Sequence, residues 1–272
     1  MLNIYDARPN DFNDAQECTT PPGYYIMLQL HTKSEMLRLL LQIIDDCRNQ
    51  IEDFKNFKGK KHLDECALYC LKVLKLGLKY QKIFFDAHSN ANSSILLSGL
   101  SKILLDVNPR SRKPDHILNT TYFMTAFNWM PIHTLEAIKI LHMISNQPSA
   151  NCQIVGIFTQ NEITKNILRQ GFVECLESEY IPVQSECSNK NFVESDEIPD
   201  IKLQIKEAII KLIQSCLCHP TPNLGQFLMG FDHLKDLQIY KGQRRGILEL
   251  GANCTKSIVS ILENHLEVSL NQ

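Results

Sequence analysis

The stretch from Ile201 to Leu217 constrains the fold most, because its apolar residues cover two sides of one helix. The first face carries six residues at helical spacing: Ile201, Ile205, Ala208, Ile209, Leu212 and Cys216. A second apolar strip is made of Leu203, Ile210 and Leu217. A helix that is apolar on two sides needs neighbours on two sides. The stretch therefore predicts a fold in which helices stack against helices.

The same periodicity recurs along the chain between corners rich in proline and glycine. Helices are predicted over residues 35–51, 63–85, 94–105, 116–127, 132–145, 150–158, 163–169 and 247–268. No stretch shows the sustained alternation and hairpin turns of β-strands. Short connections and alternating helix lengths favour an all-α fold, an α-solenoid of degenerate HEAT- or armadillo-like antiparallel helix pairs without a β-sheet. A closed helical bundle is the alternative.

Several helix ends are predicted from local signals. Thr32-x-x-Glu35 and Thr159-x-x-Glu162 match the capping-box pattern. Asn223 follows two prolines and is expected to cap a short helix that Gly230 ends. Gly171 either ends the helix before it or lies inside a longer one. Tyr24 to Leu30 is expected to be a short apolar turn.

Composition divides the chain into four parts. Residues 1–22 are polar and are expected to be an irregular lead-in, and residues 23–179 form a helical-repeat solenoid. Residues 180–199 are acidic and rich in serine, which predicts a surface loop. Residues 200–272 continue the helical repeats. Within them a polar connector over 232–246 makes the fold of the C-terminal end the least defined.

Charge and hydropathy exclude several classes of function. The net charge is −2 and the pI is about 6.5, so no strong field attracts nucleic acid or an anionic membrane. No apolar run is long enough to span a bilayer, and the residues after Met1 do not form a signal peptide. Ten cysteines are scattered through apolar helical stretches. They indicate free thiols in a reducing compartment, nucleus or cytosol.

Two cysteine and histidine clusters could bind a metal, but both are incomplete. They are His62, Cys66 and Cys70 at helical spacing, and Cys216, Cys218 and His219 at a helix end. Zinc takes four ligands, usually from two segments, and neither cluster has a fourth. Cysteines of a packed core explain the first cluster, and a histidine that complements a helix dipole explains His219. We predict no metal and no cofactor.

Catalytic and nucleic-acid motifs are missing as well. No glycine-rich nucleophile turn, phosphate-binding loop or HExxH sequence occurs, so no catalytic residue is predicted and no small-molecule ligand is expected. The basic runs Lys55–Lys61 and Arg110–Lys113 are better explained as solvated loops than as phosphate contacts or nuclear localisation signals. A metal-dependent enzyme that uses His62 or His219 is the least favoured hypothesis.

Five stretches, taken in order, resemble one protein family. They are Pro21-Pro22-Gly23, Gly59 to Leu63, Asn108-Pro109-Arg110 with Lys113 and Asp115, Gln170 to Glu177, and Pro222-Asn223-Leu224 with Leu228-x-Gly230-Phe231. Their order and spacing are similar to those of the large α-solenoid scaffold nucleoporins of the inner pore ring, the nucleoporin-two-hundred-five family and its fungal one-hundred-ninety-two counterpart. The resemblance weakens after Phe231, where Cys254 and the following helix alone look familiar.

The resemblance implies a structural role. Members scaffold the inner ring of the nuclear pore complex at the nuclear envelope and have no enzymatic activity. They hold linker nucleoporins through short helical segments docked in grooves, and they are far longer, so this chain would be an internal segment. The alternative is a soluble helical-repeat transport receptor or adaptor whose acidic segment 180–199 docks basic peptide cargo. No site residue follows from the resemblance.

Overall fold

The protein is helical throughout the part of the chain that the structure describes. A computed structural model describes residues 22–53, 58–90, 95–178, 197–231 and 251–270. Apart from one isolated β-bridge between Asn108 and Lys113, the regular elements in these ranges are helices, which confirms the all-α prediction. None of these helices combines the length and the hydropathy needed to cross a membrane.

The described helices follow one another in groups of three, which we call triads. The first triad is α1 (Pro22–His31), α2 (Glu35–Asp53) and α3 (Lys60–Asn90). The second is α4 (Leu100–Leu105), α5 (Asp115–Tyr122) with its 3-10 continuation η2 (Phe123–Ala126), and α6 (Pro131–Ser145). The third is α7 (Pro148–Thr159), α8 (Glu162–Glu177) and α9 (Glu197–Leu217). Of the fourth, the described ranges contain α10 (Leu224–Leu228) and α12 (Cys254–Leu270).

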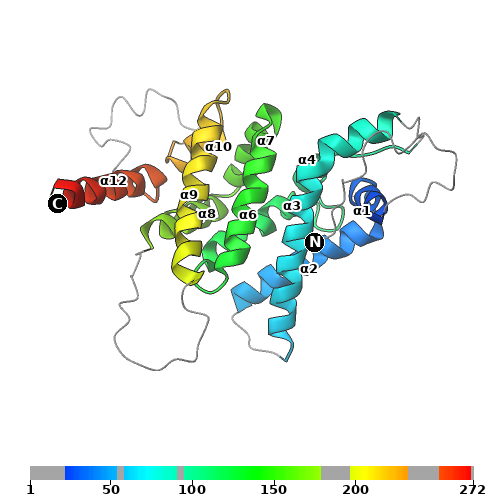
Figure 1. Ribbon diagram of the computed structural model, residues 1–272, viewed down its shortest axis with the longest axis horizontal. Coiled ribbons are helices and arrows are strands. Elements are labelled where there is room, and N and C mark those ends of the chain that lie inside the picture. The colour runs from blue at the N-terminus through cyan, green and yellow to red at the C-terminus, as the bar shows by residue number, and fades with distance from the viewer. Residues whose placement is uncertain (1–21, 54–57, 91–94, 179–196, 232–250, 271–272) are drawn as a thin grey trace.

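From the second triad on, helices in the same position of successive triads contact each other, and with α2 and α3 of the first triad they form three layers. The third helices α3, α6 and α9 pack in order, and Figure 1 shows them side by side from cyan through green to yellow. In the second layer α2 contacts α5, η2 contacts α8, and α8 contacts α12. In the first layer α4 contacts α7, and α7 contacts α10. The predicted α-solenoid is thus confirmed, and its units are armadillo-like triads where the sequence indicated pairs.

Helix α9, which has two apolar sides, is covered by other described helices on one side only. Its first face is buried as predicted: Ile205, Ile209, Leu212 and Cys216 lie in the core against α6 and α10. The second strip is exposed, with 60% of Leu203, 40% of Ile210 and 45% of Leu217 accessible. The prediction of neighbours on both sides is therefore wrong for the described residues. The second strip stays exposed because α9 lies in an outer layer and turns this strip away from the other described helices.

Both capping boxes were assigned two residues too early. The Leu37 N–H donates to Ser34 Oγ at 3.3 Å, so Ser34 caps α2, while the Thr32 hydroxyl donates back to the Leu28 carbonyl. The Ile163 N–H donates to Asn161 Oδ1 at 2.8 Å, so Asn161 caps α8. In each case the residue directly before the first helical turn reaches the free N–H groups.

Other helix boundaries also differ from the prediction. The expected turn over Tyr24 to Leu30 is part of α1, and α3 extends past the predicted 63–85 at both ends. The basic run Lys55–Lys61 therefore ends inside α3, since that helix starts at Lys60. The helix predicted over 94–105 begins only at Leu100, whose N–H is bound by Gln81 Oε1 at 2.7 Å.

A proline and an asparagine set the starts of two further helices, α7 and α12. Pro148 starts α7, where its missing N–H is not needed. Of the helix predicted over 247–268, the described part starts at Cys254, because Asn253 Oδ1 accepts the Lys256 N–H and caps α12. Residues 232–250, which include the predicted connector, lie outside the described ranges.

The short helix after the two prolines is confirmed. Asn223 Oδ1 accepts the Gln226 N–H at 2.9 Å, and Gly230 ends the turn with φ of 95°. Gly171 lies inside α8, which runs through it. Most of the predicted lead-in 1–22 and acidic loop 180–199 fall outside the described residues, but Pro22 already belongs to α1 and Glu197 starts α9.

Candidate docking pocket between the first and second triads

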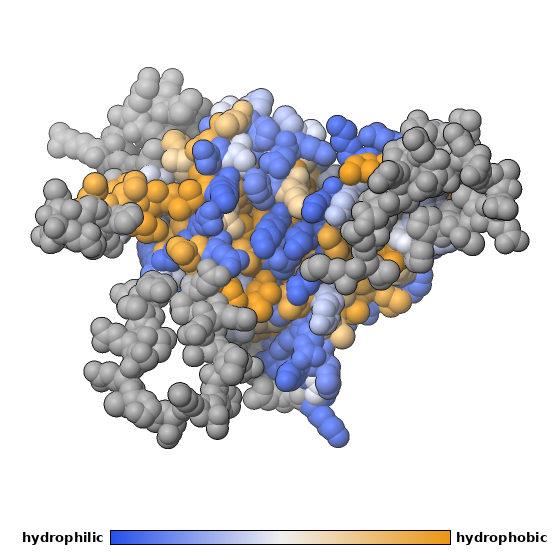
Figure 2. All heavy atoms as spheres, viewed as in Figure 1, coloured by the Kyte–Doolittle hydropathy of each residue, from blue (hydrophilic) through white to orange (hydrophobic). Residues whose placement is uncertain are grey.

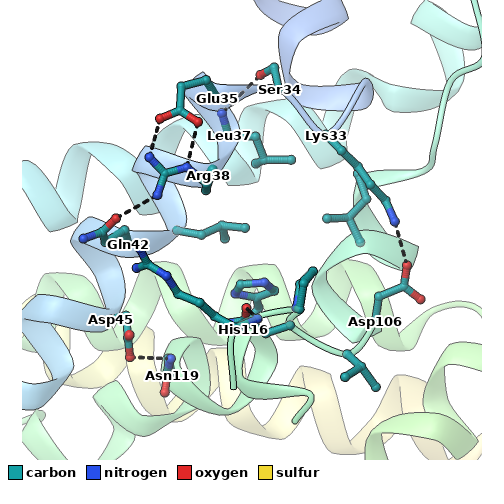
Figure 3. Close-up of a pocket in the computed structure, with 16 residues that line it drawn as sticks. Lys33, Ser34, Glu35, Leu37, Arg38, Gln42, Asp45, Asp106, His116 and Asn119 are labelled. Atoms are coloured by element: carbon teal, nitrogen blue, oxygen red, sulfur yellow. Dashed lines mark hydrogen bonds and ion pairs between the residues drawn. The ribbon is translucent and has the colours of Figure 1, made fainter. Parts of the chain in front are cut away.

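A pocket of about 330 Å³ lies where the start of α2 faces the corner between α4 and α5. Figure 3 shows the side chains of both elements around this opening. Its apolar lining comes from the two helices and the corner: Leu37, Leu41, Ile103, Val107 and Pro109. The pocket therefore sits between two neighbouring triads, where a stacked fold leaves a groove.

The corner that forms one wall is held by its own backbone. The Asn108 N–H donates to the Lys113 carbonyl and the Arg112 N–H donates to the Asn108 carbonyl, both at 2.8 Å. Asn108 Oδ1 also accepts the Arg110 N–H at 3.0 Å. Pro109 and Pro114 flank the turn and keep it from becoming helical. The basic run Arg110–Lys113 is consequently an exposed loop, as the sequence predicts.

Two of the three cationic side chains that line the pocket form ion pairs. Lys33 Nζ lies 3.4 Å from Asp106 Oδ2 and joins the two triads across the rim. Arg38 binds both carboxylate oxygens of Glu35 and donates to Gln42 Oε1 at 3.2 Å. Arg110 has no ion pair within the described ranges. It is the cation at this rim that can meet an acidic group from outside.

The polar end of the pocket is closed by a small network. Asn119 Nδ2 donates to Asp45 Oδ1 at 2.7 Å, which joins α5 to α2. Burial raises the pKa of Asp45, and the neighbouring carboxylate of Asp46 raises it further. Burial lowers the pKa of His116, while Asp115 and Asp45 act in the opposite direction. The Ser34 hydroxyl donates to the Gln29 carbonyl, so its proton is already engaged.

Together these contacts describe a binding pocket. Its apolar wall can hold a side chain such as leucine or phenylalanine, and Arg110 can pair with a carboxylate beside it. The sequence did not predict the pocket, although its corner Asn108-Pro109-Arg110 builds one wall. The opposite wall comes from α2, far away in sequence, and no local signal joins the two.

The two predicted cysteine and histidine clusters do not assemble. His62 and Cys66 are exposed whereas Cys70 is buried, and Cys218 is exposed whereas Cys216 is buried. No group of three or more His, Cys, Asp or Glu side chains in the described ranges could hold a metal ion. The eight cysteines of these ranges are free thiols, as predicted.

Burial also changes the chemistry of the buried cysteines, of which Cys47 and Cys70 are two. It raises the pKa of Cys47 to about 12 and that of Cys70 to about 11, so both thiols stay protonated near neutral pH. The thiolate is the form that attacks electrophiles and binds metals. These two cysteines therefore behave as small apolar core residues.

Comparison with known proteins assigns the whole chain to one group. Residues 3–271 match the family described as nuclear pore complex scaffold, nucleoporins 186/192/205. A Drosophila melanogaster relative, nuclear pore complex protein Nup205, is 37% identical over 309 residues and covers 98% of this chain. The human protein of the same name is 30% identical over 283 residues, also with 98% coverage. The chain spans only 15% and 14% of the lengths of these two relatives.

Proposed function

Because the chain belongs to the family of nuclear pore complex scaffold nucleoporins 186/192/205, we propose that it is a structural part of the inner ring of that complex at the nuclear envelope. The match over residues 3–271 is the observation that carries this proposal. A solenoid of stacked triads suits the role, since its surface grows with every unit and offers grooves between units. Such a scaffold supports nucleocytoplasmic transport without catalysing a reaction, and we propose no enzymatic activity.

The alternative, a soluble transport receptor, has no support from the relatives. Both are named as nuclear pore complex proteins, and the family description is that of a scaffold. The acidic segment 180–199, which would dock basic cargo, lies almost wholly outside the described residues. We therefore retain the scaffold as the single proposal.

The finer proposal concerns the partners. We propose that the chain holds linker nucleoporins through short helical segments, and that the pocket between the first and second triads receives one of them. Val107 exposes 58% of its surface at this pocket, which favours an apolar contact from outside. Arg110 next to it favours a carboxylate on the incoming segment.

Co-purification tests both levels of the proposal. The tagged 272-residue chain is expressed in cells, and inner-ring nucleoporins are measured in the eluate by quantitative mass spectrometry. We expect Val107→Glu combined with Arg110→Glu to lower the recovery of a linker nucleoporin. The control is Ile163→Glu on α8, because Ile163 is also an exposed apolar residue, with 69% accessible, and lies outside the pocket.

The possible results test the scaffold role and the docking pocket separately. Recovery of transport cargo without any inner-ring nucleoporin would overturn the scaffold role. Normal recovery of linker nucleoporins by the Val107→Glu, Arg110→Glu chain would overturn only the pocket as their docking place. Loss of recovery in the Ile163→Glu control would assign the effect to folding.

A further inference from the structure

The longest helix of the chain exposes a straight row of large apolar residues. Tyr69, Leu76 and Ile83 lie seven residues apart on α3 and expose 64%, 42% and 52% of their surfaces. Val73 and Tyr80 lie between them and are half-buried. With a rise of about 1.5 Å per residue, the three exposed side chains are spaced about 10.5 Å apart along one side of the helix. We call these five residues the α3 seam.

The α3 seam has the spacing of a coiled-coil interface. Positions 69, 73, 76, 80 and 83 alternate steps of four and three residues, which is the heptad pattern of helices that pair along their length. The opposite side of α3 is already used, because Ala67, Leu71 and Leu74 are buried in the solenoid core. The seam therefore repeats on the outer side of α3 a pattern that single exposed residues on a surface do not have.

Charge distinguishes the central part of this helix from the rest of the chain. Between Cys66 and Phe85 the sequence contains four lysines and no acidic residue, although the whole chain has a net charge of −2. Lys75 is neutralised by an ion pair with Glu136 of α6. The other three, Lys72, Lys79 and Lys82, form no ion pair within the described ranges.

Two of these lysines lie along the seam itself. Lys72 Nζ is 5.5 Å from the ring centre of Tyr69, and Lys79 Nζ is 5.2 Å from that of Tyr80. Their ammonium groups are thus held beside the apolar row by the aromatic faces. An incoming helix with carboxylates next to its own apolar row would meet one positive charge in each of two successive heptads of the seam.

We propose that the α3 seam docks an amphipathic helix of a partner protein, with apolar residues in heptad spacing and glutamate or aspartate beside them. Charge complementarity selects this occupant, since lysines flank the row and no carboxylate between residues 66 and 85 competes for them. An anionic membrane is less well matched, because three exposed side chains about 10.5 Å apart on a straight helix offer too little continuous apolar area.

This inference is independent of the proposed pocket and of the scaffold role. The pocket lies between α2 and the corner of the second triad, whereas the seam lies on α3. A contact along about two heptads also differs in kind from the insertion of one short segment into a pocket. Loss of either site leaves the other to be tested on its own.

Fluorescence anisotropy with two designed peptides tests the proposal on the 272-residue chain. Both peptides carry three heptads with leucine at the two apolar positions; one has glutamate at the flanking positions and the other has lysine. We expect the glutamate peptide to bind, and its affinity to fall as salt is added. The lysine peptide should bind at least about tenfold more weakly. Equal binding of the two peptides, or no binding of either, would overturn the proposal.

Variants place the contact on the seam. Leu76→Glu and the double change Lys72→Glu, Lys79→Glu alter two exposed positions and the half-buried Lys72, none of them in the core, so circular dichroism melting is expected to match the unmodified chain. Each change should lower the affinity for the glutamate peptide by about tenfold or more. The lysine double change should in addition make the lysine peptide the better binder. The matched control is Leu203→Glu on α9, an exposed leucine in a similar outward row.

Sedimentation with liposomes tests whether a membrane surface, and not a partner helix, binds the α3 seam. The same chain is sedimented with liposomes of phosphatidylcholine and phosphatidylserine in a ratio of about seven to three, a typical anionic composition. Sedimentation that Leu76→Glu abolishes, in the absence of peptide binding, would replace the partner helix by a membrane surface. Peptide binding that survives both seam variants would also contradict the proposal, because the contact would then lie elsewhere.

Discussion

Asn151 Oδ1 accepts a hydrogen bond from the Leu224 backbone N–H at 2.6 Å, and the same side chain donates from Nδ2 to the Ser145 carbonyl at 2.9 Å. Asn151 is fully buried in α7, while its two partners close α6 and open α10. One amide thereby ties together three successive triads. Both backbone groups belong to helix ends, where no bond within the helix can satisfy them.

We expect Asn151→Leu to be strongly destabilising. It leaves the Leu224 N–H and the Ser145 carbonyl buried without a partner, and each such loss costs about 1–3 kcal/mol. Urea unfolding followed by circular dichroism measures the change. Asn146→Leu, at the exposed residue after α6, is the control and should stay within about 0.5 kcal/mol of the unmodified chain. A small effect at Asn151 would show that water satisfies these groups.

Two helical glycines should respond in opposite directions to alanine. A Cβ on Gly171 of α8 would lie 3.1–3.3 Å from the Cβ and the backbone C and O atoms of Met124 in η2, so the two helices would have to separate. A Cβ on Gly156 of α7 would meet no atom within 4 Å. Gly156→Ala should stabilise by about 0.5–1 kcal/mol, because glycine is a poor helix former, and Gly171→Ala should destabilise. Thermal melts that shift in the same direction would contradict this.

The buried face of α9 predicts the cost of a charge. Ile209 is fully buried, whereas Lys206 one turn earlier is only half-buried. Ile209→Asp places a carboxylate in the core without a partner and should cost more than about 4 kcal/mol, with Lys206→Asp costing much less. Equal shifts in melting temperature at the two positions would show that the assigned face of α9 is wrong.

Arg169 should hold the fourth triad in place. Its Nε donates to the Phe227 carbonyl at 2.9 Å and its Nη2 to the Phe231 carbonyl at 2.7 Å, while the guanidinium lies 4.5 Å from the ring centre of Phe227. Arg169→Met keeps the length of the side chain but removes both donors. We expect hydrogen exchange to rise in α10 and α12 more than in α2 and α3. Uniform protection along the chain would disprove a local role.

Acid should weaken the fold through its buried histidines. Burial lowers the pKa of His31 and of His133 below the ordinary value of 6.5, although His133 Nε2 donates to the Asp64 carbonyl at 2.8 Å. Below pH 6.5 the unfolded chain therefore binds more protons than the folded one, so stability is full above that pH and falls as the pH drops towards the folded values. Melting temperatures between pH 7.5 and 5.5 should show this slope.

A variant separates His133 from the other titrating groups. His133→Gln can keep the bond to Asp64 but cannot titrate, so we expect a shallower loss of stability below pH 6.5. The exposed His62→Gln is the matched control and should preserve the slope of the unmodified chain. Equal slopes in the two variants would remove His133 from the explanation.

The sequence predicted what local periodicity determines. The buried face of α9, the cap at Asn223 and the turn at Gly230 all follow from residues within a few positions of each other. The capping boxes failed because the helices begin later, and Ser34 and Asn161, two residues further on, accept the first free N–H groups. Both kinds of residue can cap, and the geometry of the preceding helix decides between them.

What the sequence did not predict depends on contacts between distant segments. The start of α4 at Leu100 is set by Gln81, and the three-helix unit appears only when α6 is seen beside both α3 and α9. The pocket needs α2 and the corner at Asn108 together. The α3 seam was present in the sequence, but its exposure follows from the position of α3 at the outside of the solenoid.

The helices of the outer layer differ in length, and this makes the solenoid mechanically uneven. α3 has 31 residues, α6 has 15 and α9 has 21, so the middle helix is about 22 Å long beside one of about 46 Å. Resistance to bending grows with the width over which neighbouring units are joined. We therefore expect a load along the solenoid to deform it first at α6, which would act as the compliant joint between two stiffer blocks.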